Sequence, residues 1–316
     1  MRYSLLSRFR GALLGSFVGG ILARDGKRQV LGKAMLTLPQ PGDAKPLQIL
    51  SDWSFLATCG IESFIRCGKL DLEDWVLYNT ETQPSLELLK NTASSRSAAV
   101  ATLPIALFFH EDEVKLRQKL LQASQFWQQD GEEYEGVLAV GYAIALALTE
   151  KLDHTSLIPR ILNYLGSSQT PLTQQLEQVQ ILLEQGAGLE KTLKNLLCCV
   201  PSRGEKSKIP DISIALAFYC FLSTPEDFRL SVTRAVLSNY QPLETATITG
   251  AISGVYNSIM GIPVGWRLAA NRFSNGEKRV LLAERLLVVW SGIYDFSIIE
   301  KYPNLAIAAP RVIQPR

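Results

Sequence analysis

The residue types that most often carry metal or thiol chemistry are scarce in this chain. Its 316 residues include five cysteines and only two histidines, and no Cys-x-x-Cys pair occurs. A structural zinc site needs four such ligands at short spacings, so we expect none. The odd number of cysteines, with Cys198 and Cys199 adjacent, favours free thiols in a reducing cytoplasm. His110 and His154 are expected at the surface, at a helix end and between helices.

Glycines mark the first apolar stretch, where Gly11, Gly15 and Gly19 recur at every fourth residue. This spacing places them on one face of a helix, where a missing side chain allows close packing. No Gly-Lys-Ser/Thr follows them, so they do not form a phosphate-binding loop. The apolar run is shorter than the about 20 residues that a membrane span needs, and it lacks a signal-peptide cleavage site. We expect a buried first helix and no membrane span.

Apolar residues recur at helical spacing along most of the chain, and no alternating strand pattern occurs. Stripes with the spacing i, i+4, i+7 begin at Ala57, Leu116, Leu172, Phe228, Ile248 and Leu282. We expect Gly68 to end the helix through Phe64, Asp71 to cap the next helix and Thr224 to cap a later one.

Proline and glycine mark three expected loops or tails, at residues 38–46, at 200–210 and from Tyr302 onward. None of these has the length of an interdomain linker, and no fixed-period repeat is visible. The pattern therefore predicts an all-α fold in which residues 1–316 form a single compact helical domain.

The charge balance argues against one class of partner. The formal net charge is +2, so there is no global field that would concentrate nucleic acid or anionic membrane. The basic residues that gather near the N-terminus are expected to be solvated helix ends and loop positions. They are Arg2, Arg8, Arg10, Arg24, Lys27, Arg28 and Lys33.

Four segments carry a family resemblance. Residues 8–15 read Arg-Phe-Arg-Gly-Ala-Leu-Leu-Gly, residues 50–54 read Leu-Ser-Asp-Trp-Ser, and residues 240–245 read Tyr-Gln-Pro-Leu-Glu-Thr. A small-residue helix from Thr247 then leads to an Ile-Pro-x-x-Trp turn that ends at Trp266. In this order they resemble the ADP-ribosylglycohydrolase family, in which the second segment reads Thr-Asp-Asp-Thr and the third Gly-Gly-Asp-Thr-Asp-Thr. The resemblance implies a single orthogonal helical bundle of the ADP-ribosylglycohydrolase type.

The resemblance also implies a metal site, because the family's two acidic motifs hold two divalent cations, usually magnesium. These cations orient ADP-ribose and a water molecule, which hydrolyses the glycosidic bond to a modified side chain. The positions that keep an oxygen ligand are Ser51, Asp52, Glu244 and Thr245. The positions that have lost the family residue are Gly20, Trp53 and Pro242 for acids and Ala101 for an arginine.

With these losses we expect no tightly bound cofactor. A single weakly held Mg²⁺ or Mn²⁺ is the most that the retained residues would hold, because magnesium often uses one or two carboxylates plus water. Each retained pair also has a purely structural interpretation. Ser51 or Asp52 could cap the helix that follows, and Glu244 with Thr245 could begin and cap the motif helix.

Three hypotheses about function follow. The first is a pseudoenzyme that has lost the two-metal hydrolase site and acts by binding ADP-ribose, a related nucleotide or a protein partner. The second is an active hydrolase with a reduced one-magnesium site, in which Asp52 is the catalytic carboxylate and ADP-ribose is cleaved from a modified protein or small molecule. The third is an unrelated helical scaffold.

Overall fold

A computed structural model of the chain describes residues 3–29, 52–80, 92–128, 134–166, 169–198, 211–272 and 276–292. Within these ranges there are fifteen α-helices and no strand, which confirms the predicted all-α class. In chain order they are α1 (Leu5–Gln29), α2 (Asp52–Cys67), α3 (Leu72–Thr80), α4 (Ser95–Ala101), α5 (Leu103–Phe108), α6 (Glu113–Trp127), α7 (Glu135–Leu148), α8 (Leu157–Leu165), α9 (Pro171–Glu184), α10 (Leu189–Cys198), α11 (Ser213–Leu222), α12 (Phe228–Leu237), α13 (Pro242–Gly261), α14 (Val264–Arg272) and α15 (Gly276–Trp290).

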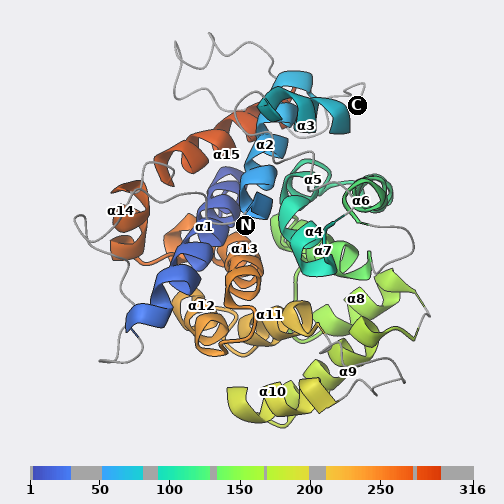
Figure 1. The fold of residues 1–316 in the computed structure, drawn as a ribbon, viewed down its shortest axis with the longest axis vertical. Helices are drawn as coiled ribbons and strands as arrows, with labels where there is room; N and C mark the ends of the chain where they lie inside the picture. The colour runs from blue at the N-terminus through green and yellow to red at the C-terminus, as the bar shows by residue number, and fades with distance from the viewer. Residues whose placement is uncertain are drawn as a thin grey trace.

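The first helix and the motif helix form the centre of the bundle. α1 and α13 pack against each other along their length, although more than 200 residues separate them in the sequence. Helices α7, α11 and α12 pack on α13, and α15 packs on α1 (Figure 1). α2 is held by α3, α4 and α15, while α8, α9 and α10 extend at the other end of the molecule (Figure 1). The N-terminal and C-terminal parts of the chain therefore build the core together.

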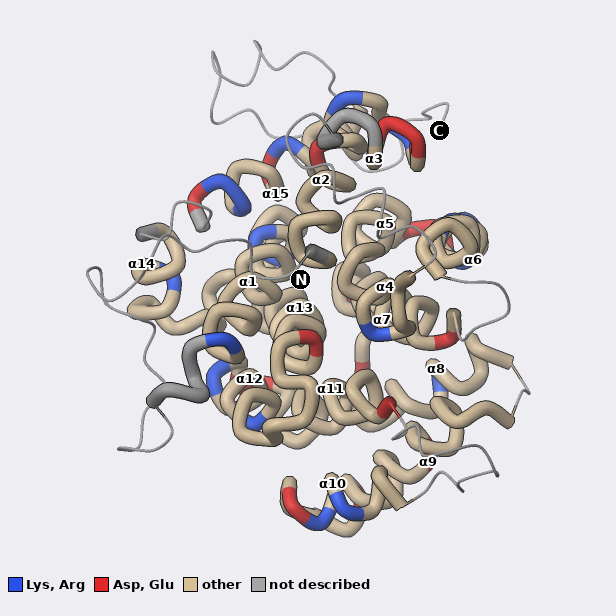
Figure 2. Tube along the Cα trace, viewed as in Figure 1, with Lys and Arg blue, Asp and Glu red and all other residues tan. Residues whose placement is uncertain are grey.

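The predicted apolar stripes form this core. Leu116, Leu120 and Ala123 on α6 have no exposed surface, and neither do Ile248 and Ile252 on α13. Helices α7 and α11 are buried along their whole length, and their sequences contain almost no charged residue (Figure 2). Burial of apolar surface at roughly 25 cal/mol per Å² is the main force that holds such a bundle together.

Two of the three predicted helix boundaries are confirmed. Gly68 follows α2 with a φ of 65°, and its N–H donates to the carbonyl of Phe64 over 2.8 Å. The Asp71 carboxylate accepts the N–H of Asp74 at the start of α3. The third prediction was wrong: Asp227, not Thr224, caps α12, because its side chain accepts the N–H of Leu230 over 2.9 Å.

The length expected for the first helix also needs correction. α1 continues beyond the apolar run, and its segment Leu5–Arg24 is long and apolar enough to cross a membrane by length and composition alone. Of the most apolar window in this segment, 78% is buried inside the fold. Buried core helices pass the same test, so the helix is accounted for by its packing on α13.

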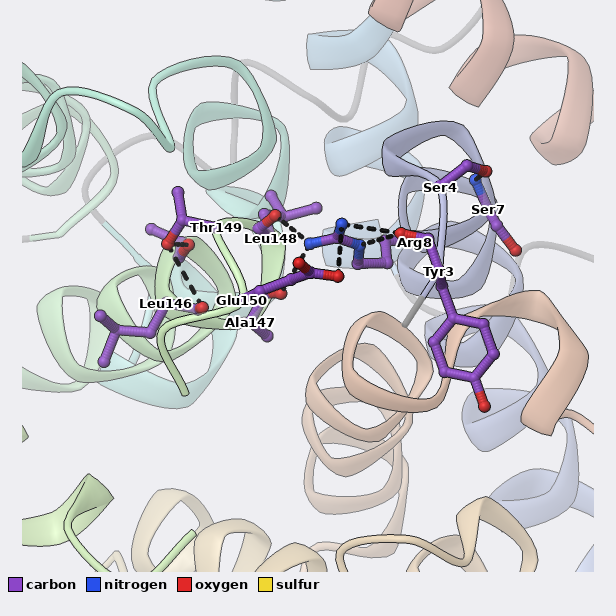
Figure 3. Close-up of polar contacts among 10 residues, drawn as sticks. Tyr3, Ser4, Ser7, Arg8, Leu146, Ala147, Leu148, Thr149 and Glu150 are labelled. Atoms are coloured by element: carbon purple, nitrogen blue, oxygen red, sulfur yellow. Dashed lines mark hydrogen bonds and ion pairs between the residues drawn. The ribbon is translucent and has the colours of Figure 1, made fainter. Parts of the chain in front are cut away.

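Arg8 departs from the expectation that the N-terminal basic residues are solvated, since it is only 5% exposed. Its guanidinium donates to the carbonyls of Ala147 and Leu148 at the end of α7 and pairs with Glu150 over 3.0 Å (Figure 3). It also donates to the carbonyl of Tyr3. The last carbonyls of a helix lack partners within the helix and carry its negative dipole end. Arg8 therefore ties the start of α1 to the end of α7.

The histidines and cysteines are placed as follows. His154 is exposed between α7 and α8 as predicted, whereas His110 is buried, so the prediction for His110 was wrong. The His110 ring packs against Phe9 and Trp290, and its Nδ1 lies 2.7 Å from the carbonyl oxygen of Leu107. The cysteines in the described ranges are free thiols: Cys59, Cys67, Cys198 and Cys220. Cys199 lies outside those ranges, as do the predicted loops and tail.

Candidate functional site

The candidate site is supported by a contact between backbones. Gly11, Gly15 and Gly19 on α1 face Gly254, Gly250 and Ala246 on α13, in antiparallel order. A Cβ atom added at Gly11 would lie 2.0 Å from the carbonyl oxygen of Gly254, far inside contact distance. The predicted close-packing face of glycines is thus present, and its partner is the motif helix. This contact fixes the distance between α13 and α1 and the position of α13 along the axis of α1.

The connection from α12 to α13 keeps an unusual backbone. Gln241 has φ 38° and ψ 54°, the left-handed conformation that glycine adopts without strain. It stands where the family motif has its second glycine. Pro242 then occupies the first turn of α13, a position where its missing N–H is not needed. Gln241 thus holds a glycine-like conformation at the position of the motif's second glycine, and Pro242 stands at the position of its first acid.

The two retained residues of α13 differ in how they are placed. Glu244 lies in the first turn, partly exposed, as predicted for an acid at a helix start. Thr245 has no exposed surface, and its hydroxyl donates to the carbonyl of Tyr240 over 3.0 Å. Thr245 is not the cap that one interpretation expected, because the cap position is Gln241. Its hydroxyl instead closes the turn that precedes the helix.

The second retained segment is only partly described. α2 begins at Asp52, but Ser51 and the side chain of Asp52 lie outside the described structure. Trp53 is partly buried against the hydrophobic core. Ser54 is buried and lines a small cavity together with Thr247 of α13. The first turn of α2 and the second turn of α13 therefore line the same cavity.

A polar group beside this site was missed by sequence reasoning. Arg96 on α4 pairs with Asp211 over 2.5 Å, and Asp211 accepts the N–H of Ser213 before α11. Burial raises the pKa of Tyr240, the Asp211 carboxylate raises it further, and Arg96 partly offsets both. No local pattern marks these residues, which come from three segments far apart in the sequence. Ala101, which stands where the family has an arginine, is fully buried in α4.

The far end of α13 bends before the predicted turn. Ser258 has φ 59° and ψ 179°, a conformation that is essentially restricted to glycine, yet it is fully buried. The helix ends at Gly261, and Trp266 on α14 donates its N–H to the carbonyl of Pro263. The Trp266 ring packs edge-on against Phe228 of α12. The Ile-Pro-x-x-Trp segment thus joins α14 to α12 through this ring contact.

The described residues offer few oxygen ligands for two magnesium ions. Among them, no three His, Cys, Asp or Glu side chains lie together as a metal-holding group. On α13 the single carboxylate of the motif is Glu244, since Pro242 has no side-chain oxygen. Two cations carry four positive charges and need several oxygen ligands. The described part of the site therefore does not fit the two-metal arrangement that the resemblance implies.

Comparison with known proteins decides the family. The family model described as ADP-ribosylglycohydrolase matches residues 1–294. The chain belongs to the ADP-ribosylglycohydrolase family. A solved structure titled "ADP-ribosylglycohydrolase-related protein complex" superposes with a TM-score of 0.57 at 17% identity, covering 90% of this chain and 99% of the other. At that identity the superposition supports the fold alone. No curated protein matches this sequence.

Family membership makes the third hypothesis, an unrelated scaffold, wrong. It also confirms the helical bundle that the resemblance implied.

Proposed function

We propose that this chain binds ADP-ribose or a related nucleotide without the metal-dependent hydrolysis of its family. One observation carries the proposal: the connection into α13 keeps a glycine-like backbone at Gln241, while Pro242 occupies the place of an acid. A left-handed non-glycine residue costs about 1–3 kcal/mol unless its surroundings impose it. This chain thus holds a glycine-like conformation at the position of the motif's second glycine at some cost, although Pro242 offers no carboxylate. A site that keeps its backbone conformation can still bind a nucleotide. Two metal ions, in contrast, require the acids that this chain lacks.

The experiment is calorimetric titration of the purified chain with ADP-ribose, once in EDTA and once in Mg²⁺. We expect a micromolar Kd that is the same in both conditions. If binding requires Mg²⁺, the metal-independent proposal is wrong. If ADP-ribose fails to bind in either condition, nucleotide binding is wrong, and a protein partner becomes the remaining form of the binding hypothesis.

The alternative is a hydrolase with one magnesium ion, and a single observation favours it. Glu244 is partly exposed in the first turn of α13 and forms no ion pair with another described residue. Its carboxylate is therefore accessible to a cation, with Asp52 as the second ligand. A magnesium-bound water would then be the nucleophile.

A Mn²⁺ titration followed by EPR separates the two functions. The metal-free proposal predicts no saturable Mn²⁺ binding in the wild type, with or without ADP-ribose. Saturable binding that is lost in Asp52→Ala and kept in Glu73→Ala would support the one-metal hydrolase instead. Glu73 is a matched control, because it is an exposed acid in the first turn of the neighbouring helix α3.

A further inference from the structure

Arg279, on α15, is a buried cation that forms no ion pair with any residue in the part of the chain that the structure describes. It is 9% exposed, and its guanidinium lies over the ring of Phe17 on α1, 4.6 Å from the ring centroid. Its Nε atom is buried and has no hydrogen-bond partner. Burial alone lowers the pKa of Arg279 to about 10, and no carboxylate among the described residues acts on it. The side chain therefore remains charged at neutral pH.

A small cavity is lined in part by Arg279, at the junction of six helices, α1, α2, α4, α5, α13 and α15. Its volume is about 10 Å³, which is the space of roughly one water molecule. The walls are mostly apolar, and the hydroxyls of Ser16, Ser54 and Thr247 also line it. Ser16 and Thr247 donate to carbonyls of their own helices, those of Leu13 and Leu243. Of the residues that line the cavity, Arg279 is the one that carries a positive charge.

A buried charge of this kind needs compensation. Transfer of an ion from water to a protein interior is unfavourable unless an opposite charge or hydrogen bonds replace the lost hydration. The contact with the Phe17 ring supplies part of this, because an aromatic face attracts a cation. Guanidinium groups do not lose their proton at physiological pH, so neutralisation by deprotonation is not open to Arg279. Among the described residues no carboxylate supplies the rest, which leaves a place for an anion from solution.

We propose that this cavity binds a monatomic anion of the size of chloride, with Arg279 as its cationic partner. The volume sets the size class, because a space for one water molecule has no room for a phosphate or carboxylate group. The apolar walls favour an anion that needs few hydrogen bonds. The site does not depend on whether the chain binds ADP-ribose.

The cavity also lies close to the positions that carry acids in the family. Glu244 precedes Thr247 by three residues and so shares its face of α13, one turn nearer the helix start. On the antiparallel α1, Gly20 follows Ser16 by one turn toward the same side. The cavity thus lies about one turn inside the positions of the family's acids. Arg279 places a permanent positive charge beneath a site where the family holds cations.

The test measures the Tm of the wild-type protein in sodium salts at constant ionic strength, replacing gluconate stepwise by chloride or bromide. We expect a rise of about 2 °C at ten times the Kd, and a further rise with the logarithm of the halide concentration. Arg279→Met should remove the response, whereas Arg285→Met should keep it. Arg285 is the matched control, because it is an exposed arginine on the same helix. A halide response of equal size in Arg279→Met would overturn the proposal.

Two further results decide the remaining cases. Bromide soaked into crystals should give an anomalous peak beside the Arg279 guanidinium, and its absence together with a flat Tm would overturn the proposal. Stabilisation by phosphate but not by halide would do the same, since it would indicate an oxyanion site. If Arg279→Met does not fold, Arg279→Lys should retain the halide response, and the wild-type titration stays decisive.

Discussion

Gly15 on α1 and Gly250 on α13 face each other so closely that a Cβ atom on either would lie within 2.3 Å of the other's carbonyl oxygen. Both neighbouring atoms belong to the backbone, so neither can move aside as the end of a flexible side chain could. The distance between the two central helices is therefore set by the absence of side chains at these positions.

Gly15→Ala should destabilise the protein by about 2–3 kcal/mol, because the added methyl group forces the two helices apart. The control is Gly265→Ala on α14, where nothing lies within 4 Å of an added Cβ and alanine improves helix propensity. Urea denaturation of both variants gives the comparison. Equal effects at the two positions would contradict the close-contact explanation.

Arg8→Met should cost about 3 kcal/mol, because it leaves the carbonyls of Ala147 and Leu148 and the carboxylate of Glu150 without this partner. Arg10→Met on the same helix removes a pair with Glu284 in which both side chains are about one-third exposed, so about 0–1 kcal/mol is expected. Chemical denaturation measures both changes. A larger loss for Arg10→Met would show that burial does not decide the contribution.

Gln241→Gly should stabilise the fold by about 0.5–1 kcal/mol. Glycine removes the strain of the left-handed conformation, and its greater freedom in the unfolded chain cancels part of this gain. The same substitution at Gln118, an exposed position within α6, should destabilise by about 1 kcal/mol. Opposite signs in thermal denaturation would confirm that the backbone at Gln241 is strained; two losses of similar size would contradict it.

The buried thiols give a prediction about pH. Burial, with a contribution from Glu62, raises the pKa of Cys59 from 9.0 to about 12, and burial raises that of Cys220 likewise. The folded state keeps these thiols protonated, so their contribution to stability is complete below pH 9 and is lost as pH rises from 9 to 12. At pH 8, iodoacetamide should label exposed Cys198 rapidly and should label Cys59 and Cys220 only after unfolding. Rapid labelling of Cys220 in the native protein would contradict this account.

The sequence predicted the features that repeat along a helix or sit at its ends. The stripes through Leu116 and Ile248 became buried faces, and Gly68 and Asp71 mark boundaries as expected. The glycine spacing on α1 predicted close packing but not the partner helix, because helical periodicity carries no information on contacts between distant segments.

The site was less predictable for the same reason. Arg8 and Arg279 look like solvated cations in the sequence, and only the packing of α7 and α1 around them buries their charges. His110 was wrongly placed at the surface because Phe9 and Trp290, which cover it, lie far away in the chain. The family resemblance located Glu244 and Thr245, yet the inward hydrogen bond of Thr245 depends on the turn at Tyr240.

The pairing of α1 with α13 has a consequence for synthesis of the protein. The ribosome completes α1 more than 200 residues before it completes α13, and translation proceeds at about 5–20 residues per second. For roughly 10–50 seconds the nascent chain thus carries an apolar helix, long enough to cross a membrane, whose partner does not yet exist. During that interval the glycine face of α1 can contact other apolar surfaces, because its partner helix has not been made. We expect a nascent chain that depends on chaperones until residue 261 leaves the exit tunnel.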